Sequence, residues 1–254
     1  MSRRRSASIL LGLVLCSMSS RAQAQPASER LMLTTSDGQQ IFAFWYAKDM
    51  PRQSPVALLL HNPGATHAHW LPILEPLQRA GFRILAIDFR GHGDSKETTP
   101  EAYEAMRQRD PKPYRDMIHD VEAAVLWLTR EQKVAPEHIG LIGGEFAANL
   151  ALEAMARNRA LGAVVAMSPS KNYYSFPLEA TTKKIGRKPI FVMVPKQILN
   201  DGASQIQAQQ SGNPAFELKV YPKYEFHGVH TLGLSWRVEE TIAKWMKKVF
   251  GLDA

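Results

Sequence analysis

The segment with the clearest chemical signature is GLIGGEFAANLAL, residues 140–152. An apolar run ends in Gly143 and Gly144, Glu145 follows, and small residues then begin a helical pattern. A sharp turn from strand to helix presents the side chain at its apex above the sheet, where a nucleophile can act. Serine usually stands at such an apex, so Glu145 indicates that the chemistry has either changed or been lost.

The two chemically active side chains that stand out are the carboxylate of Glu145 and the imidazole of His227. A carboxylate is a weak nucleophile towards an ester, because its addition to the carbonyl forms an anhydride. Glu145 therefore excludes the common acyl-enzyme route at this position. His227 precedes Gly228 near the C-terminus, and imidazole is the side chain most often used as a general base.

Strand patterns alternate with helix patterns from residue 30 onward. An Asp37-Gly38 pair predicts a hairpin, and further strands are predicted at 55–61, 82–88, 138–143, 160–169, 188–195 and 216–222. Amphipathic patterns predict helices at 69–81, 114–132, 146–158, 201–212 and 235–250. This alternation predicts the α/β class, with a mostly parallel sheet covered on both faces and a site beyond the carboxyl ends of its strands. Residues 97–113 are polar and contain prolines, so we interpret them as a short excursion above the sheet.

The first 25 residues have the pattern of a secretory signal peptide. A basic start, MSRRRSAS, precedes the apolar run ILLGLVLC, which is too short to span a membrane. Small residues in RAQAQ then predict cleavage after Ala24. Residues 26–254 are expected to form a single domain. The arginines of the leader leave both Sec export and twin-arginine export open.

Removal of this segment changes what the composition implies. The formal net charge falls from +7 to +3, and Cys16, the only cysteine, is lost. The exported chain then has no disulfide and no cysteine nucleophile, which suits a bacterial periplasmic or secreted protein. We expect no nucleic-acid partner and no stable membrane span in the mature chain.

Six motifs together resemble the α/β-hydrolase superfamily: LLLHNPG, ILAIDFRGHGDS, IGLIGGEFAANLAL, VVAMSPS, PIFVMVP and YPKYEFHG. Within it, the chain is most similar to exported serine esterases of the dienelactone-hydrolase type, over roughly residues 30–250. The resemblance implies an α/β-hydrolase fold, with a mostly parallel eight-stranded sheet and helices on both faces. It also implies that Glu145 replaces the nucleophile serine, with the elbow built by Gly143, Gly144 and Ala147. His227 matches the catalytic base, whereas His230 lies off the pattern.

The resemblance implies that the oxyanion site and the acid are altered as well. Two backbone N–H groups would hold the oxyanion, one from Phe146 and one from the loop at Asn62 and Pro63. If Pro63 stands at the donor position, it has no N–H to give. The acid position falls on Ile198 or Leu199, so Asp201 is either a displaced acid or the cap of the following helix.

Other polar residues fit structural roles better than chemical ones. Asp88, Arg90, His92 and Asp94 are interpreted as scaffold around a tight glycine turn. His67 and His69 are expected to begin a helix, since two histidines in one loop are weak evidence for a metal site. No metal and no cofactor are expected. The aromatic residues Tyr173, Tyr174 and Phe176 either line a pocket or pack a loop.

Three functions remain open at this point. The first is a catalytically inactive envelope protein that binds a small-molecule ligand or a protein partner. The second is a hydrolase in which Glu145 attacks an alkyl carbon and a water activated by His227 cleaves the resulting ester. The third is residual hydrolysis of esters or related molecules through Ser168, Ser170 or a water activated by His227. Conventional serine-esterase activity is not expected.

Overall fold

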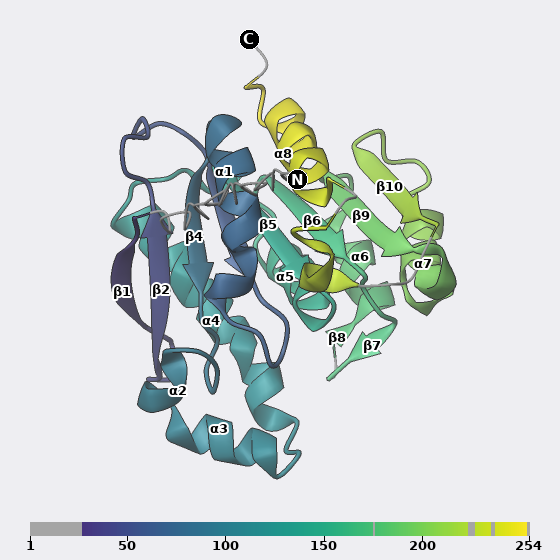
Figure 1. The fold of residues 1–254 in the computed structure, drawn as a ribbon. Coiled ribbons are helices and arrows are strands. Elements are labelled where there is room, and N and C mark those ends of the chain that lie inside the picture. Colours follow the sequence, from purple (N-terminus) through teal and green to yellow (C-terminus); the bar gives the residue numbers. More distant parts are fainter. Residues whose placement is uncertain (1–26, 175, 223–226, 235–236, 253–254) are drawn as a thin grey trace, which may run out of the picture.

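The computed structural model describes residues 27–174, 176–222, 227–234 and 237–252, and its core is one eight-stranded sheet (Figure 1). The strand order is β1-β2-β4-β3-β5-β6-β9-β10. The bounds are β1 Glu29–Thr34, β2 Gln40–Tyr46, β3 Val56–Leu60, β4 Arg83–Ile87, β5 Ile139–Gly144, β6 Ala163–Met167, β9 Ile190–Pro195 and β10 Phe216–Tyr221. All strands from β4 to β10 in this order run parallel, and β1 and β2 form the predicted antiparallel hairpin. The α/β-hydrolase fold class predicted from the sequence is confirmed.

Alternate residues of the central strands supply two separate apolar layers. On β3, Leu58 and Leu60 pack into one layer, whereas Ala57 and Leu59 pack into the other. The first layer lies under α4 Lys112–Arg130, α5 Phe146–Arg157, α6 Leu178–Ile185 and α7 Ala203–Gln209. The second lies under α1 Leu71–Arg79 and α8 Val238–Val249, which lie side by side in Figure 1. Strands buried on both faces explain the continuous apolar runs.

Two segments have more structure than the sequence patterns predicted. The excursion at 97–113 contains α2 Ser95–Thr98, α3 Pro100–Arg107 and the start of α4. The stretch after β6 forms a two-stranded ribbon, β7 Asn172–Tyr173 and β8 Phe176–Pro177, before α6 begins. Both segments lie at the lower edge of the view in Figure 1.

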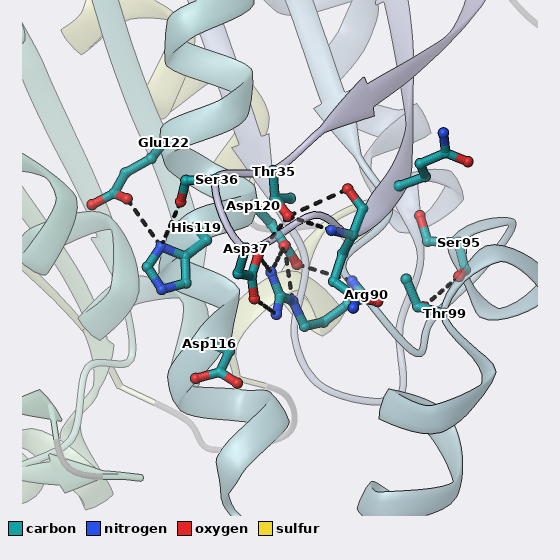
Figure 2. A network of polar contacts seen from close by, with 12 residues as sticks. Thr35, Ser36, Asp37, Arg90, Ser95, Thr99, Asp116, His119, Asp120 and Glu122 are labelled. Atoms are coloured by element: carbon teal, nitrogen blue, oxygen red, sulfur yellow. Dashed lines mark hydrogen bonds and ion pairs between the residues drawn. The ribbon is translucent and has the colours of Figure 1, made fainter.

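A buried ion network joins the β1–β2 hairpin, the loop after β4 and α4 (Figure 2). The guanidinium of Arg90 contacts Asp37 at 2.6 Å and 2.9 Å and Asp120 at 2.7 Å and 2.9 Å. The side chains of Arg90 and Asp120 are 3% and 0% exposed. Their mutual attraction therefore compensates the loss of hydration that burial imposes on each charge. Hydrogen bonds from Arg90 hold the pKa of Asp37 well below its usual range, while burial raises the pKa of Asp120 to about 6.

Residues 1–26, which include the predicted signal peptide and its cleavage site, lie outside the described residues. Within the part of the chain that is described, no helix is both long enough and apolar enough to cross a membrane.

The Arg90 network predicts a large difference between two arginine substitutions. Arg90→Gln leaves Asp120 buried without a cation and should lower the free energy of unfolding by about 3–5 kcal/mol. Arg30→Gln removes a half-exposed pair with Asp94 at 2.7 Å and should change it by no more than about 1 kcal/mol. Urea denaturation of both variants measures the difference.

The deficit of Arg90→Gln should also narrow as the pH falls from 7.5 to 5. The change comes from Asp120, because burial raises its pKa to about 6 even with Arg90 beside it, and the loss of Arg90 removes the charge and hydrogen bonds that hold this pKa down. Ionisation of Asp120 above that pKa therefore destabilises the variant more than the wild type as the pH rises. Asp37 adds nothing in this range, because its pKa is lowered and its contribution is lost only at more acidic pH. A deficit that stays constant between pH 7.5 and 5 would contradict the role of Asp120.

Candidate functional site

Glu145 stands at the apex of a strained turn between β5 and α5. Its φ of 50° and ψ of −117° lie outside the regions that residues with side chains normally adopt. The backbone N–H of Glu145 donates to the carbonyl of Met167 at 2.7 Å, which ties the apex to the end of β6. The predicted sharp elbow is therefore present, with Glu145 as the N-cap residue of α5.

The two glycines before Glu145 are required by close approaches on either side. A Cβ at Gly143 would lie 2.2 Å from the carbonyl oxygen of Ala147 in the first turn of α5. A Cβ at Gly144 would lie 2.7 Å from Oδ1 of Asn62 and 2.9 Å from the backbone nitrogen of Val229. Gly144 thus lets the loops after β3 and β10 approach the apex, and Ala147 is completely buried behind it.

Both oxygens of the Glu145 carboxylate are held by neighbouring loops. Oε1 lies 2.5 Å from Nε2 of His227, and Oε2 accepts a hydrogen bond from Nδ2 of Asn62 at 2.7 Å. The side chain of Glu145 is 18% exposed and that of His227 is 38% exposed. The structure thus brings together the carboxylate and the imidazole that stand out in the sequence, and Asn62 joins them through its side chain rather than its backbone.

Burial dominates the electrostatics of this carboxylate. It raises the pKa of Glu145, while the charges of His227 and His230 oppose that rise. The positive end of the α5 dipole also favours a carboxylate at this position. Because the pKa of Glu145 is raised overall, the effect of desolvation on this carboxyl outweighs that of the histidine charges.

The loop of His227 is held against the apex by a glycine and a serine. Gly228 has a φ of +54°, and a Cβ there would lie 2.8 Å from Cγ of Glu145. The N–H of Gly228 donates to Oγ of Ser168 at 3.3 Å, and Ser168 is buried. The backbone of Ser170 is bound by the amide of Asn149. Ser168 therefore supports the histidine loop, and this contact gives no support to its role as a nucleophile.

The loop after β3 is fixed by a neutral histidine. Nδ1 of His61 donates to the carbonyl of Asn62 at 2.7 Å, and Nε2 accepts from the N–H of Phe89 at 3.0 Å. Complete burial, together with the charge of His92, lowers the pKa of His61 to about 3. Pro63 follows Asn62 and has no N–H to offer an oxyanion. Oδ1 of Asn62 is buried and has no hydrogen-bond partner among the described residues.

The segment after β9 places apolar side chains where the resemblance expects the acid. Ile198 and Leu199 lie in a 3-10 helix, η3 Lys196–Asp201, and pack against the core. Asp201 is exposed. The interpretation of Asp201 as a helix cap is wrong, because α7 begins at Ala203 with Gly202 as its N-cap residue and no side-chain cap. The chain reaches α7 one residue later than the sequence pattern indicated.

The remaining histidine and aspartate predictions concern scaffold. His67 and His69 lie in the 3-10 helix η1 His67–Trp70, as expected of residues that begin a helix. Asp88 accepts from the N–H groups of His67 and Asp94 at 2.6 Å and 2.9 Å. Among the residues that the structure describes, no three or more histidine, cysteine or acidic side chains are grouped to hold a metal ion.

An aromatic cluster surrounds Phe146, the residue directly after Glu145. Its ring lies 5.5–6.2 Å, between centroids, from those of Tyr114, Tyr173, Tyr174 and Phe176. The sequence analysis identified Tyr173, Tyr174 and Phe176 as residues that line a pocket or pack a loop. It missed Tyr114, which belongs to a distant helix pattern. The spacing of Tyr114 within α4 offered no signal for this contact.

The comparisons with solved structures agree with this fold. Residues 41–230 match the family described as the dienelactone hydrolase family. An esterase of Pyrococcus furiosus, Pf2001, has a TM-score of 0.68 at 20% identity, and the match covers 87% of this chain and 92% of the esterase. A dienelactone hydrolase of Anabaena variabilis has a TM-score of 0.64 at 16% identity, over 90% of this chain and 98% of the hydrolase. At these identities, the likeness concerns the fold.

Two curated relatives match a shorter part of the chain. The Escherichia coli protein YfhR is 24% identical over 121 residues, which are 46% of this chain and 38% of YfhR. The lysophosphatidylserine lipase ABHD12 of Danio rerio is 26% identical over 136 residues, which are 51% of this chain and 32% of the lipase. The chain thus matches less than two-fifths of the length of each relative.

The raised pKa of Glu145 predicts a pH-dependent gain in stability for Glu145→Gln. A carboxyl whose pKa is raised by folding destabilises the protein as the pH rises through that pKa. The melting temperatures of the variant and the wild type should therefore be similar at pH 4, with the variant higher at pH 8. Calorimetry at both values tests this, and a variant less stable at pH 8 than the wild type would show that the ion pair outweighs burial.

Proposed function

Because the chain belongs to the dienelactone hydrolase family, we propose that it is an exported member which has kept the fold and lost hydrolysis. It binds a small molecule or an envelope protein at the altered site. The observation that carries the proposal is the engagement of both oxygens of Glu145, by Nε2 of His227 and by Nδ2 of Asn62. His227 and Asn62 are thereby paired with the carboxylate, so neither the imidazole nor the amide is available to an ester substrate in this arrangement.

The charge of Glu145 also acts against acyl transfer. The tetrahedral intermediate of an ester carries a developing oxyanion, which hydrolases stabilise with hydrogen-bond donors. In this site a carboxylate lies at the apex, and the Asn62 side chain donates to it. An oxyanion beside Glu145 would meet a like charge. Pro63 removes a backbone donor from the same loop.

The support for the histidine is altered too. The segment in which the resemblance expects the acid carries Ile198 and Leu199, both packed against the core. Where such an acid holds the histidine in its working tautomer, its loss lowers the rate about 10⁴-fold. Repair of one part of such a unit leaves most of the loss in place.

The alternative function is a hydrolase that uses Glu145 as the nucleophile. The specific observation in its favour is the 2.5 Å separation of Oε1 from Nε2 of His227. Glu145 would attack an alkyl carbon, the carbon–halogen bond would break, and a halide would leave. Water deprotonated by His227 would then attack the carbonyl carbon of the glutamyl ester, release the product alcohol and restore the carboxylate. This route requires His227 to leave Oε1 of Glu145, because its imidazole must be free to accept the proton of the water.

We predict that Glu145→Ser restores no more than a trace of esterase activity. Serine replaces the carboxylate and removes its charge, but the acid and the oxyanion loop stay altered. Turnover of p-nitrophenyl acetate and butyrate would be measured for Glu145→Ser, then with Leu199→Asp added, then with Pro63→Leu added. Full activity in the single variant would mean that Asp201 and Asn62 already serve as the acid and the oxyanion donor.

A panel of haloalkanes and esters separates the proposed function from the alternative. Under the proposal, the wild type and Glu145→Gln show the same background turnover. Turnover by the wild type that Glu145→Gln abolishes would overturn the proposal in favour of the carboxylate nucleophile. Mass spectrometry would then detect a glutamyl ester on Glu145 during turnover.

Export predicts a shortened chain outside the cytoplasm. The basic start, the apolar run and the small residues before Gln25 predict that the mature protein begins near Gln25. Mass spectrometry of the periplasmic or secreted fraction of a bacterial expression host measures the N-terminus. An intact Met1 confined to the cytosol would contradict export.

A further inference from the structure

The aromatic cluster beside the elbow is a feature that the loss of hydrolysis does not explain. Phe146 is only 1% exposed and lies at its centre. Beside it, the rings of Tyr114 and Tyr174 stack at a centroid distance of 4.2 Å with an interplanar angle of 9°. Tyr114 comes from α4 and Tyr174 from the turn between β7 and β8, so two distant segments supply the stack.

Tyr174 is both strained and exposed. Its φ is +44°, which is unfavourable for a residue with an aromatic side chain. The residue remains 39% exposed despite the stack on Tyr114. Strained residues that the surrounding structure holds in place gather at ligand sites, because the strain fixes a side chain in advance of binding. An exposed ring held in this way is suited to contact a ligand.

Glu145, which directly precedes Phe146 in the chain, retains the capacity to accept further hydrogen bonds. A carboxylate offers about four lone-pair sites, and the contacts with Asn62 and His227 use one donor on each oxygen. Its side chain is 18% exposed, so a ligand can reach it. The negative charge repels anions and attracts cations.

We propose that the site recognises an organic cation, an ammonium group carried on an apolar or aromatic body. The ammonium is attracted by Glu145 and by the electron-rich face of Tyr174 that the stack on Tyr114 leaves uncovered. The inference rests on the proposed function, since a carboxylate committed to catalysis would not be free to bind a cation. It adds the class of ligand to that function.

Isothermal titration calorimetry with three small probes tests the class of ligand. Benzyltrimethylammonium is the cation, benzyl alcohol is the uncharged probe, and benzoate is the anion. The wild type should bind the cation about tenfold more tightly than the alcohol and should not bind benzoate measurably. Equal affinity for the cation and the alcohol, or binding of benzoate alone, would overturn the inference.

Four variants locate the binding. Glu145→Gln and Tyr174→Ala should each weaken binding of the cation about fivefold or more, whereas Tyr174→Phe keeps the ring and should stay within about twofold of the wild type. Tyr103→Ala is the matched control, because Tyr103 lies on α3 and faces the ammonium of Lys96 at 3.7 Å. Cation binding unchanged in both Glu145→Gln and Tyr174→Ala would overturn the assignment. Melting curves identify any variant that does not fold, and Glu145→Gln then tests the site without a change in the aromatic cluster.

The two proposals fail separately. Ester or haloalkane turnover that depends on Glu145 would contradict the loss of hydrolysis, whatever the calorimetry gives. A wild type that neither turns over these substrates nor prefers the cation would contradict only the ligand class.

Discussion

The strained backbone of Glu145 and the two hydrogen-bonding contacts of its carboxylate hold the loops after β3 and β10 together at the site. The unfavourable φ of 50° persists because β5 and β6 hold the turn from one side and α5 holds it from the other. With the apex fixed, the carboxylate reaches the loop after β3 through Asn62 and the loop after β10 through His227. Three segments far apart in the chain thus meet at one side chain.

This meeting requires three glycines, each for a different contact. Gly143 leaves room for the first turn of α5, Gly144 for the side chain of Asn62, and Gly228 for the stem of Glu145. A serine at the apex would be two heavy atoms shorter than Glu145 and could not span the same gap to Asn62. The longer side chain of Glu145 therefore bridges the loops after β3 and β10 across the apex. The site is better described as a cross-link between loops than as an incomplete triad.

Sequence patterns predicted the strands and helices because these depend on local rules, and the family resemblance then indicated the roles of Glu145 and His227. Apolar runs determine the strands, and the carboxyl ends of parallel strands must lie at one edge. The side-chain role of Asn62 was not predicted, because the family resemblance assigns only backbone N–H donors to this loop. The boundary at Asp201 was missed because the N-cap residue of α7 is Gly202, which has no side chain to cap the helix. The contact of Tyr114 with Tyr174 depends on tertiary packing, which periodicity does not encode.

The accessibility of a buried charge decides whether it can bind a ligand, as Arg90 and Glu145 show. Arg90 is 3% exposed and two carboxylates compensate its charge, so its hydrogen-bond donors are used within the protein. Glu145 is also desolvated enough for its pKa to rise, yet 18% of its side chain remains exposed. A carboxylate that is desolvated but still accessible gains more from an added cation than one in water, because fewer water molecules must be displaced and the local dielectric is lower. The same burial that makes Glu145 unfavourable in the unliganded protein thus favours a positively charged ligand.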